Sequence, residues 1–193
     1  MNHRASGVLL PVYALPSPHG IGTLGRAAYD FADFLHAAGQ RCWQMLPLGQ
    51  TGFGDSPYQS FSSFAGNPYF IDLDLLVEDG LLTGDEADAC CAGIDPRYVD
   101  YGRLYTERFA VLEKAFHRGW LRDREQVECF QRENAAWLSD YADFMALKDR
   151  FGSQPWTAWP ESFRRRTGPG YAAAVAACGE DFAQRRSFYI YLQ

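Results

Sequence analysis

The sequence lacks the features of several common protein classes. No apolar run approaches the roughly 18 residues of a membrane-spanning helix, and the N-terminus opens no long apolar stretch of the signal-peptide kind. Basic residues are few, since 18 lysines and arginines stand against 24 aspartates and glutamates. Nucleic acids and anionic membranes bind surfaces with a basic excess. With a net charge of -6, the chain is expected to have neither a nucleic-acid nor a membrane partner.

Signals for metals and cofactors are missing as well. The five cysteines include no Cys-x-x-Cys spacing, and no histidine lies near Cys90 and Cys91 to complete a zinc site. These adjacent cysteines cannot easily bridge to each other, so reduced thiols in the cytoplasm are the favoured interpretation. The glycines between Gly20 and Gly25 do not have the spacing of a dinucleotide-binding loop. The sequence therefore predicts no cofactor, no metal and a cytoplasmic location.

The first 50 residues predict a strand, a helix and a second strand. An apolar run in residues 7–12 indicates a buried strand, and residues 42–48 form a second buried strand that ends near a proline. Between them Gly39 stands where a helix C-cap belongs, after apolar residues at helical spacing: Ala28, Phe31, Ala32, Leu35 and Ala38. A strand, a helix and a strand within about 40 residues make a βαβ unit, with parallel strands and a right-handed crossover.

The chain becomes helical after Leu73. Two sets of residues recur at helical spacing: Tyr105, Phe109, Leu112 and Phe116, and then Trp137, Tyr141, Phe144 and Phe151. No convincing strand appears between residues 74 and 193. Residues 180–193 form a patterned helix that stops without a capping residue, and two parallel strands do not make a stable sheet by themselves. The sequence predicts the start of a larger α/β protein, such as a TIM barrel of about 250 residues.

The stretch between these two parts is the best candidate for function. Residues 54–69 are too polar and too rich in turn formers for a core element, yet they carry rings that an idle surface loop has no reason to expose: Tyr58, Phe61, Phe64 and Tyr69. Aromatic rings stack on the apolar faces of pyranoses, while hydroxyls and amides bond sugar hydroxyls. Ligands of α/β folds bind at the C-terminal ends of strands, which this stretch follows. We therefore interpret residues 50–69, the aromatic loop, as substrate-binding.

Four blocks of sequence resemble a known family. They are Ser6-Gly-Val-Leu-Leu, Leu15-Pro-Ser-Pro-His-Gly-Ile-Gly-Thr-Leu-Gly, Trp43-Gln-Met-Leu-Pro-Leu and Gly54-Asp-Ser-Pro-Tyr-Gln-Ser-Phe-Ser-Ser-Phe-Ala-Gly-Asn-Pro-Tyr-Phe-Ile-Asp-Leu. In this order and spacing they are similar to the N-terminal region of the 4-α-glucanotransferases, the amylomaltases or disproportionating enzymes of glycoside hydrolase family 77. The similarity is looser further on, where Val99-Asp100-Tyr101 and Phe188-Tyr-Ile-Tyr-Leu-Gln are recognisable. By this resemblance the chain corresponds to the first two-fifths or so of a family member.

The resemblance implies a fold and a reaction. Family members are (β/α)8 TIM barrels with helical insertions, so residues 1–73 would begin an incomplete barrel and residues 74–193 would form a mainly helical subdomain. They cleave an α-1,4-glucan and pass the glycosyl part to the 4-hydroxyl of another glucan, in starch and glycogen metabolism. The mechanism is retaining, with one carboxylate as nucleophile and a second as acid and base. The family's catalytic carboxylates lie beyond residue 193, so we expect no catalytic residue here and a chain that is inactive alone.

The resemblance also supplies candidate substrate-binding residues. The tyrosine matching Tyr58 contacts the glucose ring beside the scissile bond, and the serine matching Ser56 bonds glucan hydroxyls. The residue matching Phe53 is a tyrosine in some members, where it helps to form a secondary glucan site in an outer groove. Tyr101 is interpreted as a second element of that groove. Asp55 is a further candidate, although a carboxylate next to Ser-Pro is also typical of a turn cap.

Other residues are interpreted as structural. The spacing of Asp72 and Asp74 suits a strand edge that leads into a helix better than a catalytic pair. Tyr13-Ala14 stands where Thr-Ser is usual in the family, and we expect it to contact no site residue. A position in the core is the alternative to a binding role for Tyr58.

Three functions remain open at this point. The favoured one is a 4-α-glucanotransferase with α-1,4-glucan or maltooligosaccharide donors and acceptors. The second is a truncated, non-catalytic maltodextrin-binding module. The third is a vestigial piece without a ligand, which self-associates through the exposed face of the incomplete barrel. Glucan binding would separate the first two from the third, and turnover would separate the first from the second.

Overall fold

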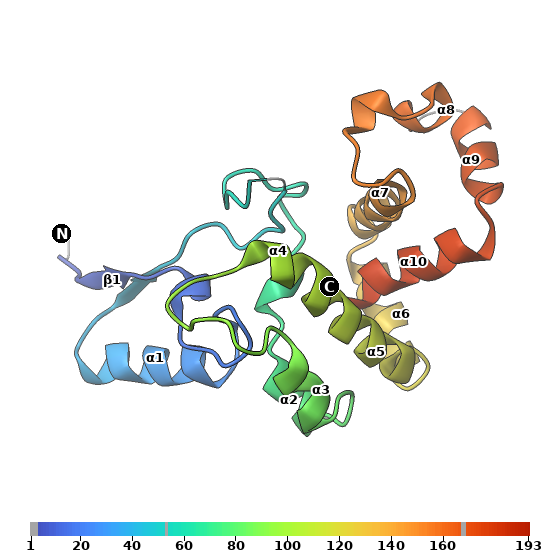
Figure 1. Ribbon diagram of the computed structural model, residues 1–193. Coiled ribbons are helices and arrows are strands. Elements are labelled where there is room, and N and C mark those ends of the chain that lie inside the picture. The colour runs from blue at the N-terminus through green and yellow to red at the C-terminus, as the bar shows by residue number, and fades with distance from the viewer. Residues whose placement is uncertain (1–3, 53, 167–168) are drawn as a thin grey trace. The chain divides into compact units, whose positions relative to one another are not determined.

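The computed structural model in Figure 1 describes residues 4–52, 54–166 and 169–193. The chain divides into two compact units, Met1–Leu121 and Arg122–Gln193, which are described separately. The elements of the first unit are β1 (Gly7–Leu9), the 3-10 turn η1 (Val12–Ala14), α1 (Arg26–Ala37), β2 (Cys42–Gln44), the 3-10 turn η2 (Pro68–Phe70), α2 (Leu73–Glu78), α3 (Gly84–Ala89), α4 (Tyr101–Arg103), the π-helix η3 (Leu104–Arg108) and α5 (Phe109–Gly119).

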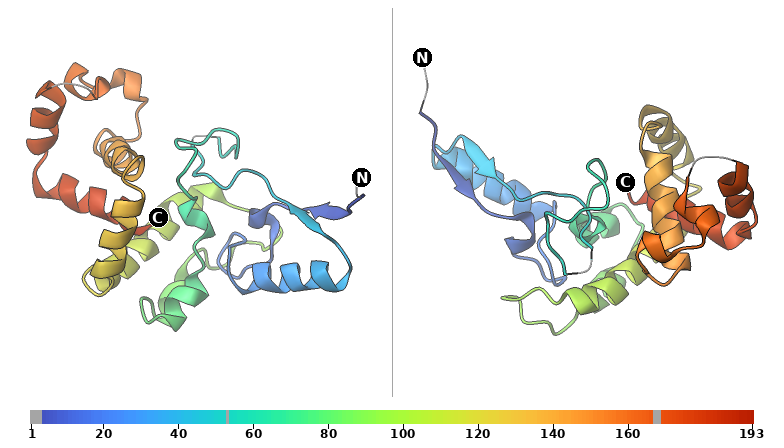
Figure 2. Two further views of the ribbon diagram at one scale, coloured as in Figure 1. Left: turned by 180° about the vertical axis from the view of Figure 1, so that it is seen from behind. Right: turned by 90° about the horizontal axis from the view of Figure 1, so that it is seen from above.

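The predicted βαβ unit is confirmed. β1 and β2 pair in parallel, with Val8 opposite Trp43, and α1 is the crossover that runs beside them (Figure 2). α1 packs on the sheet through Phe31, whose ring meets that of Trp43 edge to face at 4.9 Å. Gly39 follows the helix with a φ of +70°, the left-handed conformation expected just after a C-cap.

The predicted burial of the two strands is wrong. Each strand has three residues, and Val8 and Leu9 in β1 are 37% and 55% exposed. β1 stops before Pro11, which has no N–H to donate to a ladder. The sheet formed by the described residues has only two strands, so apolar side chains of β1 lack the neighbouring strands that would cover them.

The core of the first unit lies among its helices. Leu73, Leu104 and Leu112 are almost completely buried, and α5 is the amphipathic helix predicted from its spacing. α3 begins with a capping box, in which the Glu86 N–H donates to the Thr83 hydroxyl and the Thr83 N–H donates to the Glu86 carboxylate. This arrangement satisfies two backbone donors at the start of a short helix.

The second unit is helical. Its elements are α6 (Arg124–Glu133), α7 (Leu138–Arg150), the 3-10 turn η4 (Trp156–Ala158), α8 (Glu161–Arg164), α9 (Pro169–Ala176) and α10 (Gly179–Tyr191). α7 packs against α10, which it crosses (Figure 1), and the Tyr189 hydroxyl donates to the Asp149 carboxylate at 2.8 Å. Among the described residues after 74 there is no strand, as predicted. Over the same described ranges, no helix of either unit combines the length and the apolar character needed to cross a bilayer.

Candidate functional site

The aromatic loop is closed by a narrow neck. Two isolated antiparallel bridges pair Gly49 with Gly66 and Thr51 with Ser60. Beside them, the Asn67 N–H donates to the Leu48 carbonyl at 2.8 Å. A side chain at Gly49 would collide with the side chain of Ser60, so the two arms of the loop approach closely only because this residue is glycine. The loop therefore has a fixed base, although its described residues form no regular strand or helix before η2.

The tip of the loop carries three of the predicted site residues. Asp55 has a φ of +55°, and its N–H donates to the Gly52 carbonyl at 3.1 Å. Next, the Ser56 carbonyl accepts the N–H of Gln59 at 3.1 Å, which makes a second tight turn. Tyr58 follows with 73% of its surface exposed, so the alternative that it belongs to the core is wrong. The two turns thus hold a large aromatic ring at the surface of the first unit.

Three other polar side chains of the loop, those of Ser60, Ser62 and Asn67, bind the loop's own backbone. The Ser60 hydroxyl donates to the Ser62 carbonyl at 2.8 Å, and the Ser62 hydroxyl accepts the N–H groups of Phe64 and Ala65. Asn67 caps η2 by accepting the Tyr69 N–H at 3.0 Å. These three residues, part of the pattern that suggested sugar recognition in the sequence, thus help to fold the loop.

Tyr69 is not exposed, and the expectation that it is a surface ring is wrong. It is 6% exposed, because the η2 turn after Asn67 carries it into the unit. Its ring packs edge to face against Phe109 at 5.8 Å and lies 6.3 Å from the ring of Tyr101. Tyr69 is therefore the support of the site and not its surface.

Tyr69 and Tyr101 come together from two segments of the chain, and both respond to the charge of Asp55. Burial is the main cause that raises the pKa of both tyrosines, and the negative charge of Asp55 raises both further. Partial burial also raises the pKa of Asp55 itself. Tyr101 begins α4, where Asp100 caps the helix by accepting the Arg103 N–H at 3.1 Å. The result is a pair of neighbouring phenol rings, 6.3 Å apart between centroids, whose pKa values the charge of Asp55 raises.

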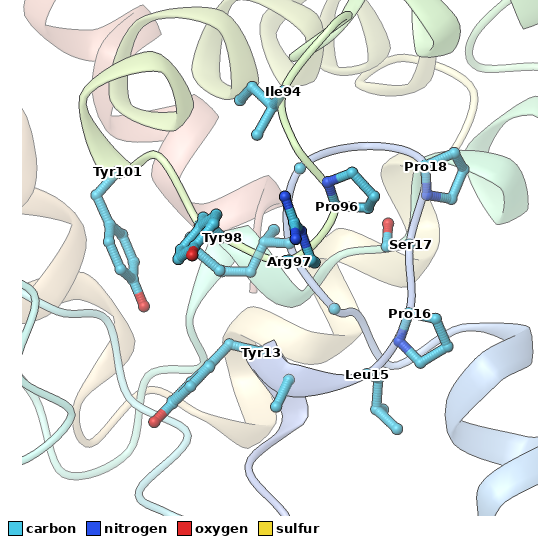
Figure 3. Close-up of a pocket in the computed structure, with 15 residues that line it drawn as sticks. Tyr13, Leu15, Pro16, Ser17, Pro18, Ile94, Pro96, Arg97, Tyr98 and Tyr101 are labelled. Carbon is cyan, nitrogen blue, oxygen red and sulfur yellow. The ribbon is translucent and has the colours of Figure 1, made fainter.

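Tyr101 also lines a pocket of about 780 Å³ (Figure 3). Tyr13 and Tyr98 contribute two further rings, and the Pro16-Ser17-Pro18 turn forms another part of the wall. Arg97 lies in the lining as well, but its guanidinium is paired with Asp95 at 2.6 Å. The pocket thus offers aromatic rings and hydroxyls and little net charge, a composition that suits a neutral polyhydroxylated ligand.

Sequence reasoning missed this pocket. Tyr13 and Ala14 were expected to contact no site residue, but both line the same pocket as Tyr101. A signal was present, since Tyr98 lies three residues before Tyr101 and the proline-rich turn follows Tyr13. Phe53, the remaining predicted site residue, lies outside the described residues.

The two neighbouring aspartates are structural, as interpreted. Asp72 is the N-cap of α2, where its carboxylate accepts the Leu75 N–H at 3.0 Å and the hydroxyl of Thr23. The Asp74 carboxylate lies 2.9 Å from Nε2 of the buried His19, within hydrogen-bond distance. The expected strand edge is absent here, since Asp72 follows the η2 turn directly. Within the described ranges, no group of three or more His, Cys, Asp or Glu side chains could hold a metal ion.

Comparison with known proteins gives the family. The sequence model of glycoside hydrolase family 77, described as 4-alpha-glucanotransferase, matches residues 10–193. The chain belongs to the 4-α-glucanotransferase family. The predicted family is thereby confirmed, and the match covers nearly the whole chain.

Individual relatives agree with this assignment. The 4-alpha-glucanotransferase of Streptococcus pneumoniae is 48% identical over 190 residues, which are 98% of this chain and 37% of that protein. The 4-alpha-glucanotransferase of Thermus thermophilus is 47% identical over 93% of this chain and 36% of that protein. The chain therefore spans about a third of the length of the curated relatives it matches.

A solved structure of the family has the same fold. The amylomaltase from Streptococcus agalactiae in complex with acarbose superposes with a TM-score of 0.90 and 40% identity, over 99% of this chain and 38% of that one. The amylomaltase from Corynebacterium glutamicum shares the fold with a TM-score of 0.66 at 20% identity. The arrangement of strands, loop and helices described above is thus that of the corresponding part of an amylomaltase.

Proposed function

We propose that this chain supplies part of the glucan-binding site of a 4-α-glucanotransferase. The enzyme transfers α-1,4-glucan segments between maltodextrins by a retaining double displacement. Family membership supports the reaction, and the amylomaltase neighbour was solved with acarbose bound. The observation that carries the proposal for this chain is Tyr58, a ring 73% exposed on a loop whose base is fixed by two bridges.

The site residues have distinct roles in this proposal. Tyr58 stacks on a glucose ring, and the Ser56 hydroxyl and the Asp55 carboxylate bond the sugar's hydroxyls. Tyr101, together with Phe53, forms an outer glucan groove that continues into the pocket beside Tyr13. Rings and hydroxyls suit an α-1,4-glucan, because each glucose unit has an apolar face and a rim of hydroxyls.

No residue of this chain is assigned to the chemical step. A retaining mechanism needs two carboxyl groups about 5–5.5 Å apart across the scissile bond. Asp72 and Asp74 are engaged in a helix cap and a contact with His19, so we do not give them this role. In this proposal residues 1–73 begin a (β/α)8 barrel and residues 74–193 form its helical subdomain. The parallel strand pair and the crossover α1 support the barrel.

The alternative is a binding module without turnover, or a piece that binds no glucan and self-associates. Leu9 is exposed and leaves apolar surface on β1. Of these two possibilities, this surface favours self-association. A cytoplasmic location and the absence of nucleic-acid or membrane partners stay predictions.

One incubation tests the proposal. The chain is mixed with maltotriose and the oligosaccharide lengths are read by mass spectrometry, with Tyr58→Ala as the control, while calorimetry measures the binding of maltoheptaose. Binding by the wild type that is lost in Tyr58→Ala is expected. Glucose and longer maltodextrins in the same experiment would mean that the chain carries catalysis too, and that our assignment of no catalytic residue is wrong. Equal binding by Tyr58→Ala would refute the proposed role of the loop.

A further inference from the structure

Arg108 is a buried cation with an unusual set of contacts. It is the last residue of the π-helix η3 and is 0% exposed. Its Nη2 donates to two backbone carbonyls, that of Tyr69 at 3.1 Å and that of Ile71 at 2.6 Å. Its Nε and Nη1 are also buried, and they have no hydrogen-bond partner among the described residues. Only one of the three guanidinium nitrogens thus bonds oxygen atoms, and the thiol of Cys90 is at best a weak further partner. Burying a cation with so few strong hydrogen bonds is costly.

The electrostatics agree with this description. Burial lowers the pKa of Arg108. Cys90, through its charge and a weak side-chain hydrogen bond, and then Cys91 and Asp72 oppose this lowering only in part. No carboxylate forms an ion pair with Arg108 within the part of the chain that the structure describes. An apolar side chain of similar length would avoid the cost of burying the charge. Packing alone therefore does not explain an arginine here.

A second arginine shows the ordinary arrangement. Arg118 lies on α5, the helix that directly follows η3, and also donates to a backbone carbonyl, that of Leu81, at 2.9 Å. Its guanidinium is paired in addition with the carboxylate of Glu86 at 2.6 Å and is partly exposed. Arg118 thus fastens the α2–α3 connection at ordinary cost, and it is a matched control for Arg108.

The two carbonyls that Arg108 binds lie at the end of the aromatic loop. They flank Phe70, whose own carbonyl accepts the Leu24 N–H at 3.0 Å. Tyr69, which bears the first carbonyl, packs against Tyr101 and lies close enough to Asp55 for that charge to raise its pKa. Arg108 therefore fixes the backbone from which one supporting ring of the site projects.

We infer that Arg108 is a positioning residue of the glucan site, which holds Tyr69 beside Tyr101 by binding the carbonyls of Tyr69 and Ile71. The inference rests on the proposed function for the identity of the ligand, but the positioning itself does not. η3 agrees with it, because π-turns within helices are found frequently at functional sites.

Hydrogen exchange tests the positioning without any ligand. The amides of Asp55 and Tyr69 are both hydrogen-bonded within the loop, so their exchange reports its order. In Arg108→Met we expect both to exchange at least about tenfold faster, since two charge-assisted bonds are lost. In Arg118→Met we expect faster exchange only near Glu86 and Ala87. Unchanged exchange at Tyr69 in Arg108→Met would overturn the inference.

Maltoheptaose binding, measured by calorimetry, tests the consequence for the site. Arg108→Met is expected to bind about tenfold more weakly or worse, and Arg118→Met to bind like the wild type. Arg108→Lys keeps a charged donor one bond shorter, so both its affinity and its exchange should fall between those of Met and arginine. If Arg108→Met does not fold, Arg108→Lys decides, and wild-type exchange at Tyr69 in that variant refutes the inference.

The two proposals fail in different ways. A wild-type chain that binds no maltoheptaose refutes the proposed glucan site. The exchange rates of the variants still test whether Arg108 positions Tyr69. A wild type that binds, with Arg108→Met binding equally well or Arg118→Met weakened as much, refutes the positioning role alone.

Discussion

The neck of the aromatic loop predicts a large effect for a small substitution, Gly49→Ala. A methyl group at Gly49 would stand 2.9 Å from the Cβ of Ser60 and closer still to its hydroxyl, with the Ser62 carbonyl at 3.3 Å on another side. Ordinary contacts of this kind begin near 3.4 Å. Because the arms are joined by backbone bridges, they cannot separate without breaking hydrogen bonds.

The magnitude follows from this crowding. Overpacking of one methyl group costs about 1–3 kcal/mol. For a unit of this size that corresponds to a loss of roughly 4–12 °C in melting temperature, at about 4 °C per kcal/mol. The loop should also open at its base, so the affinity for maltoheptaose should fall together with the stability.

Thermal melts followed by circular dichroism, with calorimetry for the sugar, measure both effects. Gly84→Ala is the matched control, since a methyl group there meets nothing within 4 Å and Gly84 opens helix α3. It should stabilise by up to about 1 kcal/mol. Adding Ser60→Gly to Gly49→Ala removes both crowded atoms and should recover part of the loss. A Gly49→Ala variant that melts within a degree or so of the wild type would refute the close approach.

Three other substitutions have separate expected outcomes. Tyr58→Ala should change the free energy of unfolding by less than about 0.5 kcal/mol in urea titrations, because the ring is exposed, while glucan binding falls; a large loss of stability would mean that the ring is packed. Asp72→Ala should cost about 1–3 kcal/mol in the same titrations, because it removes the cap of α2 and the partner of Thr23, and a neutral result would contradict both contacts. Asp55 has its pKa raised above 3.8, so its contribution to stability is greatest at low pH and declines as the pH rises through the pKa of the folded state. Asp55→Asn should therefore stabilise the chain near pH 7 and have little effect well below that pKa, and a gain confined to low pH would show the opposite shift.

The sequence was sufficient to predict the first secondary-structure elements and the family, because both depend on local sequence patterns. The apolar period ending at Gly39 predicts α1, and two apolar runs around it predict the parallel pair. The block around Tyr58 predicts a loop with an exposed ring, and the structure has one. These features depend on residues that are neighbours in the chain.

The rest depends on which distant segments meet. Tyr69 looks like a loop ring, but it is buried by Tyr101 and Phe109, which lie 30 to 40 residues later in the chain. The sequence gives no role to Tyr13, because the pocket it lines is completed by a distant segment that contains Tyr98. Arg108 in a helical pattern is typical of a solvated face, and only the carbonyls of another segment explain its burial.

The bridges at the base of the aromatic loop make it a module that could be exchanged. Because Gly49 meets Gly66 and Thr51 meets Ser60, the chain enters and leaves the tip at nearly the same place. Lengthening a loop between joined ends costs little, only about 0.6 kcal/mol for each doubling. Tips of other lengths or with other rings could be grafted between residues 52 and 59 without disturbing β2 or η2. Designers can therefore vary what the loop presents while its attachment stays the same.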